Sequence, residues 1–132
     1  MIPPPIIKAL LFIWMAACAQ FYNLDPERFQ ALAIVESRPA GGPELAIRVG
    51  EMGDTGLWGP FGINEKCFSK KAAVKYKNPY WNILTAAKTM RRLINKYGSW
   101  KAALHKYNAN CNIAYIKEIE RIKRKLERSN EE

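Results

Sequence analysis

The sequence predicts a mainly α-helical protein that forms a single domain over residues 1–132. Apolar residues recur at steps of three and four in five separate segments, which is the repeat of a helix with one buried face. Capping residues stand at the ends of most of these segments. Most of the glycines fall between Arg38 and Asn64, so the chain also carries a long glycine-rich loop. A length of 132 residues, with 48% hydrophobic and 25% charged residues, suits one globular domain.

The first apolar run, residues 9–19 (ALLFIWMAACA), has two interpretations. It is like a signal-peptide core with a cleavage site after Ala19, although the preceding MIPPPIIK holds one lysine and three prolines. It also fits the first helix of the domain, which we favour because apolar residues recur there with helical spacing. These residues are Ile7, Leu10, Leu11, Trp14, Met15 and Cys18. The run is too short for a conventional transmembrane helix, so we expect no stable membrane span.

The second predicted helix begins after Asp25, whose side chain suits the N-cap, with Pro26 at the first helical position. Pro39 disfavours helical geometry in the residue before it, so the helix ends at Ser37 or Arg38. The stripe that faces the core consists of Phe29, Leu32, Ala33 and Glu36. An acid therefore continues an apolar face.

Three more helices are predicted after the loop. One is capped by Asn78, begins at Pro79 and ends before Gly98, and its apolar stripe is Ile83, Ala87, Met90, Leu93, Ile94 and Tyr97. The next begins after Ser99, and its apolar face is Trp100, Ala103, Leu104 and Tyr107. The last is a basic helix over about 113–128, with Ile113, Ile116, Ile119, Ile122 and Leu126 among lysines, arginines and glutamates.

The glycine-rich segment over residues 38–64 is expected to be irregular, with short extended pieces at most. A compact domain rarely keeps so long a loop unless the loop forms a binding wall or a lid.

A net charge of +9 and a pI near 9.6 favour a polyanionic partner: nucleic acid, an anionic membrane surface or the acidic bacterial cell wall. The segments 115–128 (YIKEIERIKRKLER) and 66–77 (KCFSKKAAVKYK) support a nucleic-acid-binding module. Glutamates interleave the positive charges of 115–128, however, and Glu120 with Arg124 is expected to form a pair within the helix. We therefore favour a solvated helix face and expect no nucleic-acid partner.

The cysteines and the histidine do not form a predicted site. Cys18, Cys67 and Cys111 match no metal spacing, and free thiols are favoured over a Cys67–Cys111 disulfide. His105 is expected to be exposed on its helix. We expect no metal and no cofactor.

Glu36 has the surroundings of a proton donor. Burial disfavours the anion, and the C-terminal end of a helix presents the negative end of its dipole, so both effects raise the pKa. A free glutamate titrates near ~4.3, whereas a general acid at neutral pH needs roughly 6 to 7. The alternative is a solvated carboxylate that pairs with Arg38 or a lysine.

Four segments in order resemble the signature segments of the lytic transglycosylase domain of the soluble-transglycosylase group, which is related to goose-type lysozyme. They are LAIVES (32–37), GPFGIN (59–64), NPYWNI (78–83) and LHKYNAN (104–110). The similarity runs from about Leu24 to Tyr115. It implies a lysozyme-like helical domain that cleaves the β-1,4 bond between N-acetylmuramic acid and N-acetylglucosamine in peptidoglycan.

The resemblance also implies roles for single residues. Glu36 matches the catalytic acid and Ser37 its usual neighbour. The residues that match the loop lining the sugar cleft are Gly59, Phe61, Ile63 and Asn64. Tyr107 and Asn108 match a tyrosine–asparagine pair that faces the glutamate, with the phenol orienting it. From the residues alone, Tyr107 can equally be a core tyrosine bonded to a backbone carbonyl.

The chain departs from the family pattern at several positions. Gly62 stands where the family has a glutamine, which removes an amide that contacts sugar. Asn110 replaces the final glycine of the Tyr-Asn-Ala-Gly motif, and asparagine also tolerates a left-handed C-cap. The family serine partway along the loop has no clear counterpart, although Thr55 can substitute for it.

The resemblance implies a mechanism with one carboxylate, in which Glu36 acts first as acid and then as base and leaves a 1,6-anhydromuramyl product. If Glu51 or Asp54 positions a water, lysozyme-type hydrolysis is the alternative; Glu44 and Glu65 are the other acids in or beside the loop. A non-catalytic module that binds cell wall or nucleic acid is the rival class. We expect a monomer that acts on peptidoglycan glycan strands in the cell envelope or periplasm, or in association with a phage.

Overall fold

The computed structural model describes residues 4–37, 45, 47, 57–58, 60–61, 63–64, 77–108 and 111–131. These residues form the helices α1 (Pro4–Phe21), α2 (Pro26–Ser37), α4 (Pro79–Tyr97), α5 (Trp100–Tyr107) and α6 (Ile113–Glu131). Two short strands, β1 (Leu57–Trp58) and β2 (Ile63–Asn64), form an antiparallel pair. The mainly α-helical fold class is confirmed.

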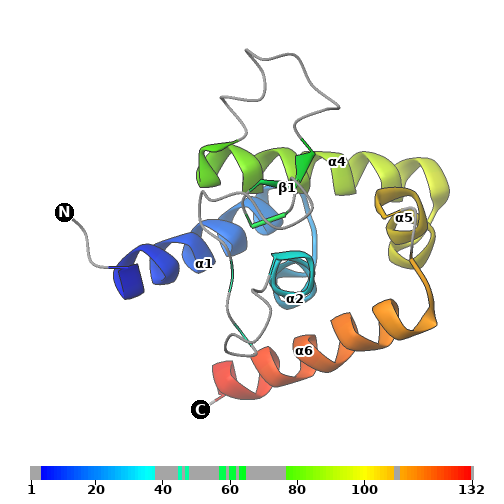
Figure 1. The fold of residues 1–132 in the computed structure, drawn as a ribbon. Coiled ribbons are helices and arrows are strands. Elements are labelled where there is room, and N and C mark those ends of the chain that lie inside the picture. Colours follow the sequence, from blue (N-terminus) through cyan, green and yellow to red (C-terminus); the bar gives the residue numbers. More distant parts are fainter. Residues whose placement is uncertain are drawn as a thin grey trace.

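Helix α2 lies at the centre of the molecule, with α4 above it, α1 to its left and α6 below it in Figure 1. It packs against both α1 and α6. Its buried residues are Phe29, Ala31, Leu32, Ala33, Ile34 and Ser37. The predicted stripe is therefore buried, but burial extends around most of the helix, as expected for a helix enclosed by others.

The predicted helix caps are confirmed. The side chains of Asp25, Asn78 and Ser99 accept hydrogen bonds from Arg28 N, Tyr80 N and Ala102 N at 3.1, 2.9 and 3.1 Å. Helix α4 ends at Gly98, whose φ of 91° is the left-handed geometry that favours glycine. The structure adds a cap that was not predicted: Asn112 accepts a hydrogen bond from Tyr115 N at 2.9 Å.

The first apolar run forms part of helix α1, which packs against α2 and α4. Its core side is Leu11, Met15, Cys18 and Ala19, all buried. The expectation for Leu10 was wrong, because this side chain points outward together with Ile6 and Ile13. Helix α1 is apolar on two sides, and periodicity alone did not separate them. In the described part of the chain, no helix is long and apolar enough to cross a membrane.

Two other predicted core residues, Tyr97 and Ile113, are exposed. Each stands at a helix end, where the apolar repeat continues past the point at which neighbouring helices cover it. The ring of Tyr97 lies beneath the ammonium groups of Lys96 and Lys106, at 5.4 and 5.2 Å from its centroid. These residues therefore form a surface cluster and not part of the core.

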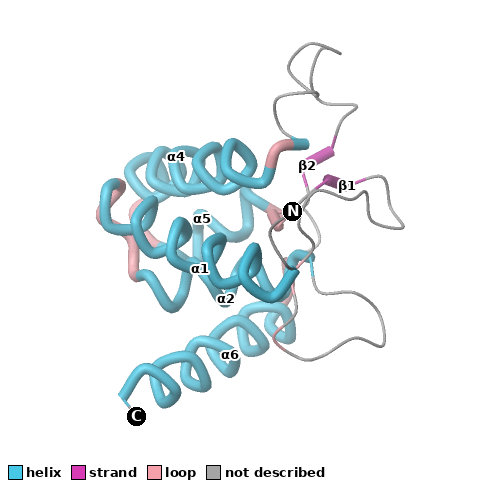
Figure 2. Tube along the Cα trace, turned by 90° about the vertical axis from the view of Figure 1, so that its left-hand side faces the viewer, coloured by secondary structure: helices cyan, strands magenta, loops and turns pink. Residues whose placement is uncertain are grey.

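Helix α6 crosses below α1 and α2 in Figure 2 and packs against α2 through Ile119 and Ile122. The expected pair between Glu120 and Arg124 is replaced by a pair between helices, in which Arg28 Nε and Nη2 contact the two carboxylate oxygens of Glu120 at 2.9 and 3.4 Å. The cationic side chain of α2 lies closer to Glu120 than the expected partner on α6.

The strand pair is anchored to the helical core through Phe61, which lies in the turn between β1 and β2. Its ring is buried and stacks on Phe29, with centroids 4.6 Å apart. Its N–H donates to Asn82 Oδ1 at 2.9 Å, and its carbonyl accepts from the Tyr107 hydroxyl at 3.3 Å. Both main-chain polar groups of Phe61 are thus satisfied by side chains of α4 and α5.

Candidate active site

Glu36 lies in the last turn of α2 and is half-buried. The hydroxyl of Tyr115, in the first turn of α6, donates a short hydrogen bond to Glu36 Oε1. The amide Nδ2 of Asn108, the C-cap of α5, donates to the same oxygen at 3.4 Å. Three helix ends therefore meet at one carboxyl group.

The turn between α5 and α6 brings the two donors to Glu36. Asn108 N donates to Leu104 O at 2.9 Å and so ends α5, while Cys111 N donates to Asn108 O at 2.9 Å. The Asn112 cap then starts α6 and sets Tyr115 within its first turn. Asn108, which ends α5, and Asn112, which caps α6, thus place the side chains of Asn108 and Tyr115 beside Glu36.

The pKa of Glu36 is raised, and burial is the largest cause. The hydrogen bonds from Tyr115 and Asn108 act in the opposite direction, because they stabilise the anion, but they do not cancel the effect of burial. No acidic residue in the described part of the chain contributes to this shift. Glu36 therefore keeps its proton to a higher pH than a solvated glutamate does, as the sequence analysis expected.

The two oxygens of the carboxyl group differ. Both hydrogen bonds that the described residues give to Glu36 end on Oε1. Because an oxygen that accepts two hydrogen bonds is the worse position for a proton, the acidic proton belongs on Oε2. This arrangement leaves Oε2 as the oxygen that can donate to a ligand.

The neighbours of Glu36 remain protonated. The pKa of Tyr115 is raised by burial and by the negative charge of Glu36, and the pKa of Tyr107 is raised by the same two causes. Both phenols therefore act as hydrogen-bond donors and not as phenolates. The pKa of Cys111 is likewise raised by burial and by Glu36. Its thiol is free and half-buried, and a protonated thiol is a poor nucleophile.

The structure separates the roles predicted for the tyrosine–asparagine pair. Asn108 contacts Glu36, whereas the hydroxyl of Tyr107 donates to the backbone carbonyl of Phe61. The phenol bonded to Glu36 is that of Tyr115, and it also hydrogen-bonds with Asn108. The alternative that the residues alone left open for Tyr107, a tyrosine bonded to a carbonyl, is the one observed.

The other predicted residues lie around this centre. Ser37 is buried, and its hydroxyl donates to Ala33 O at 2.9 Å within α2. Phe61 is in the core, and Ile63 and Asn64 form β2 directly after it. Gly59 lies outside the described residues. So do the other loop positions that the sequence analysis named: Arg38, Glu44, Glu51, Asp54, Thr55, Gly62, Glu65, Cys67 and Asn110. His105 is exposed, and Cys18 is a buried free thiol.

Two residues of the site were missed, and the sequence held a signal for each. Tyr115 is spaced four and seven residues before Ile119 and Ile122, so it continues the buried stripe of α6 toward α2. Asn82 falls within the buried stripe of α4, where a polar side chain needs a partner, and it accepts the Phe61 N–H. In both cases a polar group on an apolar stripe marked the site.

A helical domain that shelters a proton on one carboxyl group, held by a tyrosine and an asparagine, has the features of an acid catalyst of glycan cleavage. The family profile described as "Transglycosylase SLT domain" matches residues 14–129, and the chain belongs to this family. Comparisons with curated proteins and with solved structures found no match. Family membership indicates lytic transglycosylase activity on peptidoglycan in general, with peptidoglycan as the substrate.

Proposed function

We propose that this protein cleaves the β-1,4 bond between N-acetylmuramic acid and N-acetylglucosamine without water and leaves a 1,6-anhydromuramyl end. The observation that carries this proposal is the carboxyl group of Glu36, which is half-buried, has a raised pKa and accepts hydrogen bonds from the described residues Tyr115 and Asn108 on Oε1. One such group can serve as acid and then as base, and a raised pKa favours both roles because it makes the group a better base while it still holds its proton to higher pH.

In the first step, Oε2 of Glu36 gives its proton to the glycosidic oxygen. The bond between that oxygen and C1 of the muramic acid residue breaks, and N-acetylglucosamine leaves with the new hydroxyl. The neighbouring N-acetyl group stabilises the positive charge at C1. The hydrogen bonds from Tyr115 and Asn108 stabilise the carboxylate that remains.

In the second step, the carboxylate of Glu36 removes the proton of the 6-hydroxyl group on the same sugar. Oxygen O6 then bonds to C1 and closes the anhydro ring. The proton returns to Glu36, so the enzyme regains its starting state and no water is consumed. This route needs one carboxylate, in keeping with the absence of an acidic contribution to the pKa of Glu36 among the described residues.

Other site residues are assigned by what their side chains contact. Tyr107 and Asn82 hold the backbone of Phe61, and we infer that they position the strand pair beside Glu36. Ser37 is bonded inside α2, and we assign it to the support of Glu36. Ile63 and Asn64 of β2, with Gly59, are the residues that we propose for the wall of the sugar cleft.

The substrate sets the location that we propose. Peptidoglycan strands lie in the bacterial cell wall, so the protein acts in the cell envelope or periplasm, or as part of a phage that crosses the wall. The charge of +9 suits an anionic wall polymer. We propose that it acts as a monomer.

Mass analysis of digested peptidoglycan tests this proposal. We expect muropeptides with anhydromuramyl ends, each lighter by one water than the corresponding reducing end. Reducing ends would show hydrolysis, and a lack of products from folded protein would show a binding protein.

Glu36→Gln supplies the site variant, and it should release no product while its circular dichroism and unfolding temperature stay close to those of the unmodified protein. Glu27→Gln is the matched control, because it makes the same change in the first turn of the same helix. It should leave the product yield unchanged.

A further inference from the structure

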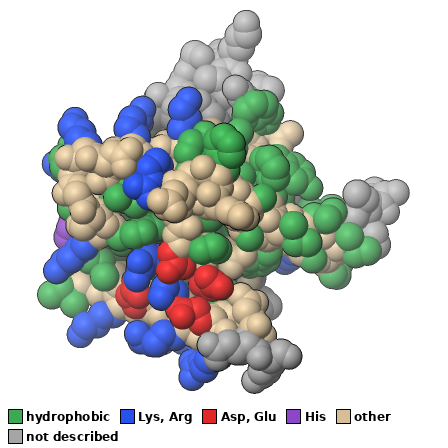
Figure 3. All heavy atoms as spheres, turned by 180° about the vertical axis from the view of Figure 1, so that it is seen from behind, with side chains coloured by type: hydrophobic (Ala, Val, Ile, Leu, Met, Phe, Trp, Pro, Cys, Tyr) green, Lys and Arg blue, Asp and Glu red, His purple; other side chains and the backbone are tan. Residues whose placement is uncertain are grey.

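Apolar side chains that the core does not use gather on one face of the molecule. Helix α1 exposes Ile6, Leu10 and Ile13, with exposed fractions of 51%, 39% and 67%. The start of α4 exposes Tyr80 and Trp81, at 40% and 44%. Figure 3 shows hydrophobic side chains gathered over this part of the molecule. Single exposed apolar residues are ordinary, but a contiguous group marks an interaction site.

The exposed apolar residues of α1 and α4 form one surface because Trp14 of α1 contacts Tyr80 of α4. Its indole N–H donates to Tyr80 O at 3.0 Å, and its ring meets the Tyr80 ring edge-on with centroids 5.9 Å apart. Ile6, Leu10 and Ile13 follow the helical repeat, so they share the side of α1 that faces away from buried Leu11 and Met15. The surface is therefore a second apolar side of α1, continued by the aromatic residues of α4.

The part of the chain that matches the family profile does not include this apolar side of α1. The match to the transglycosylase family begins at residue 14, so the three exposed aliphatic residues of α1 precede it. They also lie outside the core cluster.

The charge of the same face has one sign. Helices α1 and α4 contain no aspartate or glutamate, and their charged residues are Lys8, Lys88, Arg91, Arg92 and Lys96. The guanidinium group of Arg91 donates hydrogen bonds to the carbonyls of Tyr22 and Asn23. Lys88 and Arg92 are exposed, and they lie seven and eleven residues after Trp81 on the same outer stripe of α4.

We propose that this α1–α4 surface (Ile6, Leu10, Ile13, Tyr80 and Trp81, with Lys88 and Arg92) binds the surface of an anionic phospholipid membrane. Aliphatic side chains of an interfacial helix enter the boundary between headgroups and acyl chains. Tryptophan and tyrosine favour the headgroup level, and lysine and arginine are attracted to lipid phosphates. A soluble anionic polymer would need the cations but not the exposed isoleucines and leucine.

Vesicle flotation tests the proposal without peptidoglycan, so its outcome is independent of the cleavage reaction. The protein is mixed with vesicles of phosphatidylcholine alone or with one quarter phosphatidylglycerol. We expect binding to the anionic vesicles that weakens as salt is added, and much weaker binding to the neutral ones. Equal binding to both, or no binding to either, would overturn the proposal.

The triple variant Ile6→Ser, Leu10→Ser, Ile13→Ser tests the apolar part. We expect it to lower the partition coefficient at least roughly tenfold, because three apolar side chains lose their burial in the membrane. Ile113→Ser is the matched control, since Ile113 is 70% exposed on α6, and it should bind as the unmodified protein does. If the triple variant binds normally, the surface recognises charge alone and the proposal fails.

Paired charge variants test the cationic part. Lys88→Gln with Arg92→Gln should weaken binding by about fivefold for each charge removed. Lys117→Gln with Arg124→Gln removes two exposed charges from α6 and should have a much smaller effect. An equal loss in both pairs would show that net charge, and not this surface, attracts the vesicles.

Tryptophan fluorescence reports which surface meets the lipid. Brominated acyl chains should quench the protein, and Trp81→Phe should remove much of that quenching. Trp100→Phe should not, because Trp100 is half-buried beneath Arg28. Sedimentation without lipid completes the test: a change from dimer to monomer in the triple variant would identify the surface as a contact between copies and would overturn the membrane proposal.

Discussion

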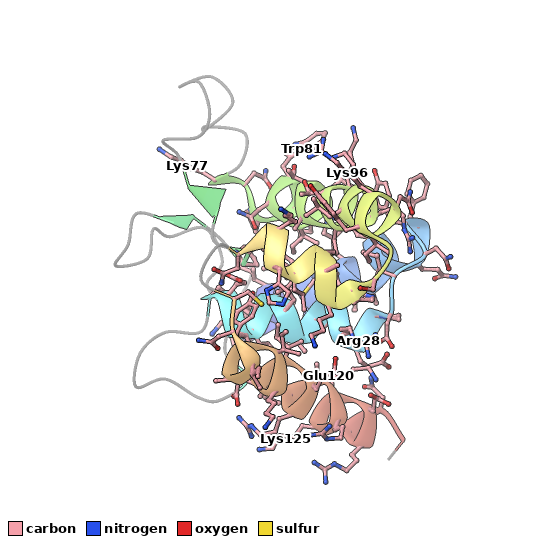
Figure 4. The ribbon with its side chains drawn as sticks, turned by 90° about the vertical axis from the view of Figure 1, so that its right-hand side faces the viewer. Arg28, Lys77, Trp81, Lys96, Glu120 and Lys125 are labelled. Atoms are coloured by element: carbon pink, nitrogen blue, oxygen red, sulfur yellow. The ribbon has the colours of Figure 1, made fainter. Side chains whose placement is uncertain are left out.

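The α2–α6 half of the molecule pairs its positive charges with acidic side chains, whereas the α1–α4 half has positive charges without acids in its helices. In the first, cations meet acids across and along the helices: Arg28 Nε contacts Glu120 at 2.9 Å, and Lys123 Nζ contacts Glu127 at 2.7 Å and Asp25 at 3.8 Å. In the second, neither helix contains an acid. Figure 4 shows Arg28 and Glu120 pointing toward one another, with Trp81 and Lys96 at the far side on α4.

This difference shows that a count of positive charges is a poor guide to where a polyanion binds. The segment 115–128 holds the densest run of lysine and arginine in the described chain, and it was the main support for a nucleic-acid module. In the structure, its Arg121 pairs with Glu118 and its Lys123 with Glu127. Among the described helices, α1, α4 and α5 carry lysine and arginine but no aspartate or glutamate.

The largest expected effect contrasts the apolar residues of the two halves. Ile122 is buried between α6 and α2, so Ile122→Ala should lower the free energy of unfolding by about 2 to 5 kcal/mol. Ile13→Ala makes the same change at a side chain that is 67% exposed, and it should cost less than roughly 0.5 kcal/mol. Denaturant unfolding measures both. Similar losses would mean that the outer side of α1 is covered after all.

The next effect concerns Glu36, the partly buried acid of the α2–α6 half. Glu36 donates a proton only while it is protonated, so activity falls as the pH rises through its pKa. The hydrogen bond from Tyr115 lowers that pKa, so Tyr115→Phe should raise it and move the alkaline limb of kcat/KM to higher pH. A hydrogen bond to a charged group contributes about 1.5 to 3 kcal/mol, which is roughly one to two pH units.

The same variant should also lower kcat by roughly tenfold or more, since the phenol holds the carboxyl group in place and stabilises its anion. Tyr107→Phe is the control, because its hydroxyl bonds to Phe61 O and not to Glu36. It should leave the position of the alkaline limb nearly unchanged. A limb that moves to lower pH in Tyr115→Phe would contradict the assignment.

Helix ends and the buried acid could be predicted from the sequence because they depend on neighbours in the chain. Asp25, Asn78, Ser99 and Gly98 act through main-chain groups a few residues away, and Glu36 continues the stripe of its own helix. The partners of Glu36 were harder to predict from the sequence, because the contact between Tyr115 and Glu36 depends on how α6 packs against α2. Family resemblance supplied Asn108 but not Tyr115, for which the helical repeat was the available signal.

The smallest expected effects are those of the surface charges on stability. Arg28 and Glu120 are 26% and 34% exposed, so solvent screens their pair, and a double-mutant cycle with Arg28→Ala and Glu120→Ala should give a coupling of about 0.5 to 1 kcal/mol. Lys88→Gln and Arg92→Gln should change the free energy of unfolding by less than roughly 0.5 kcal/mol, since both side chains are exposed on a helix without acids. Added salt should reduce the coupling of the first pair and leave the stability effect of the second pair small. If Lys88 and Arg92 instead stabilise the fold as Arg28 does, their charges serve the structure, and the contrast between the two halves disappears.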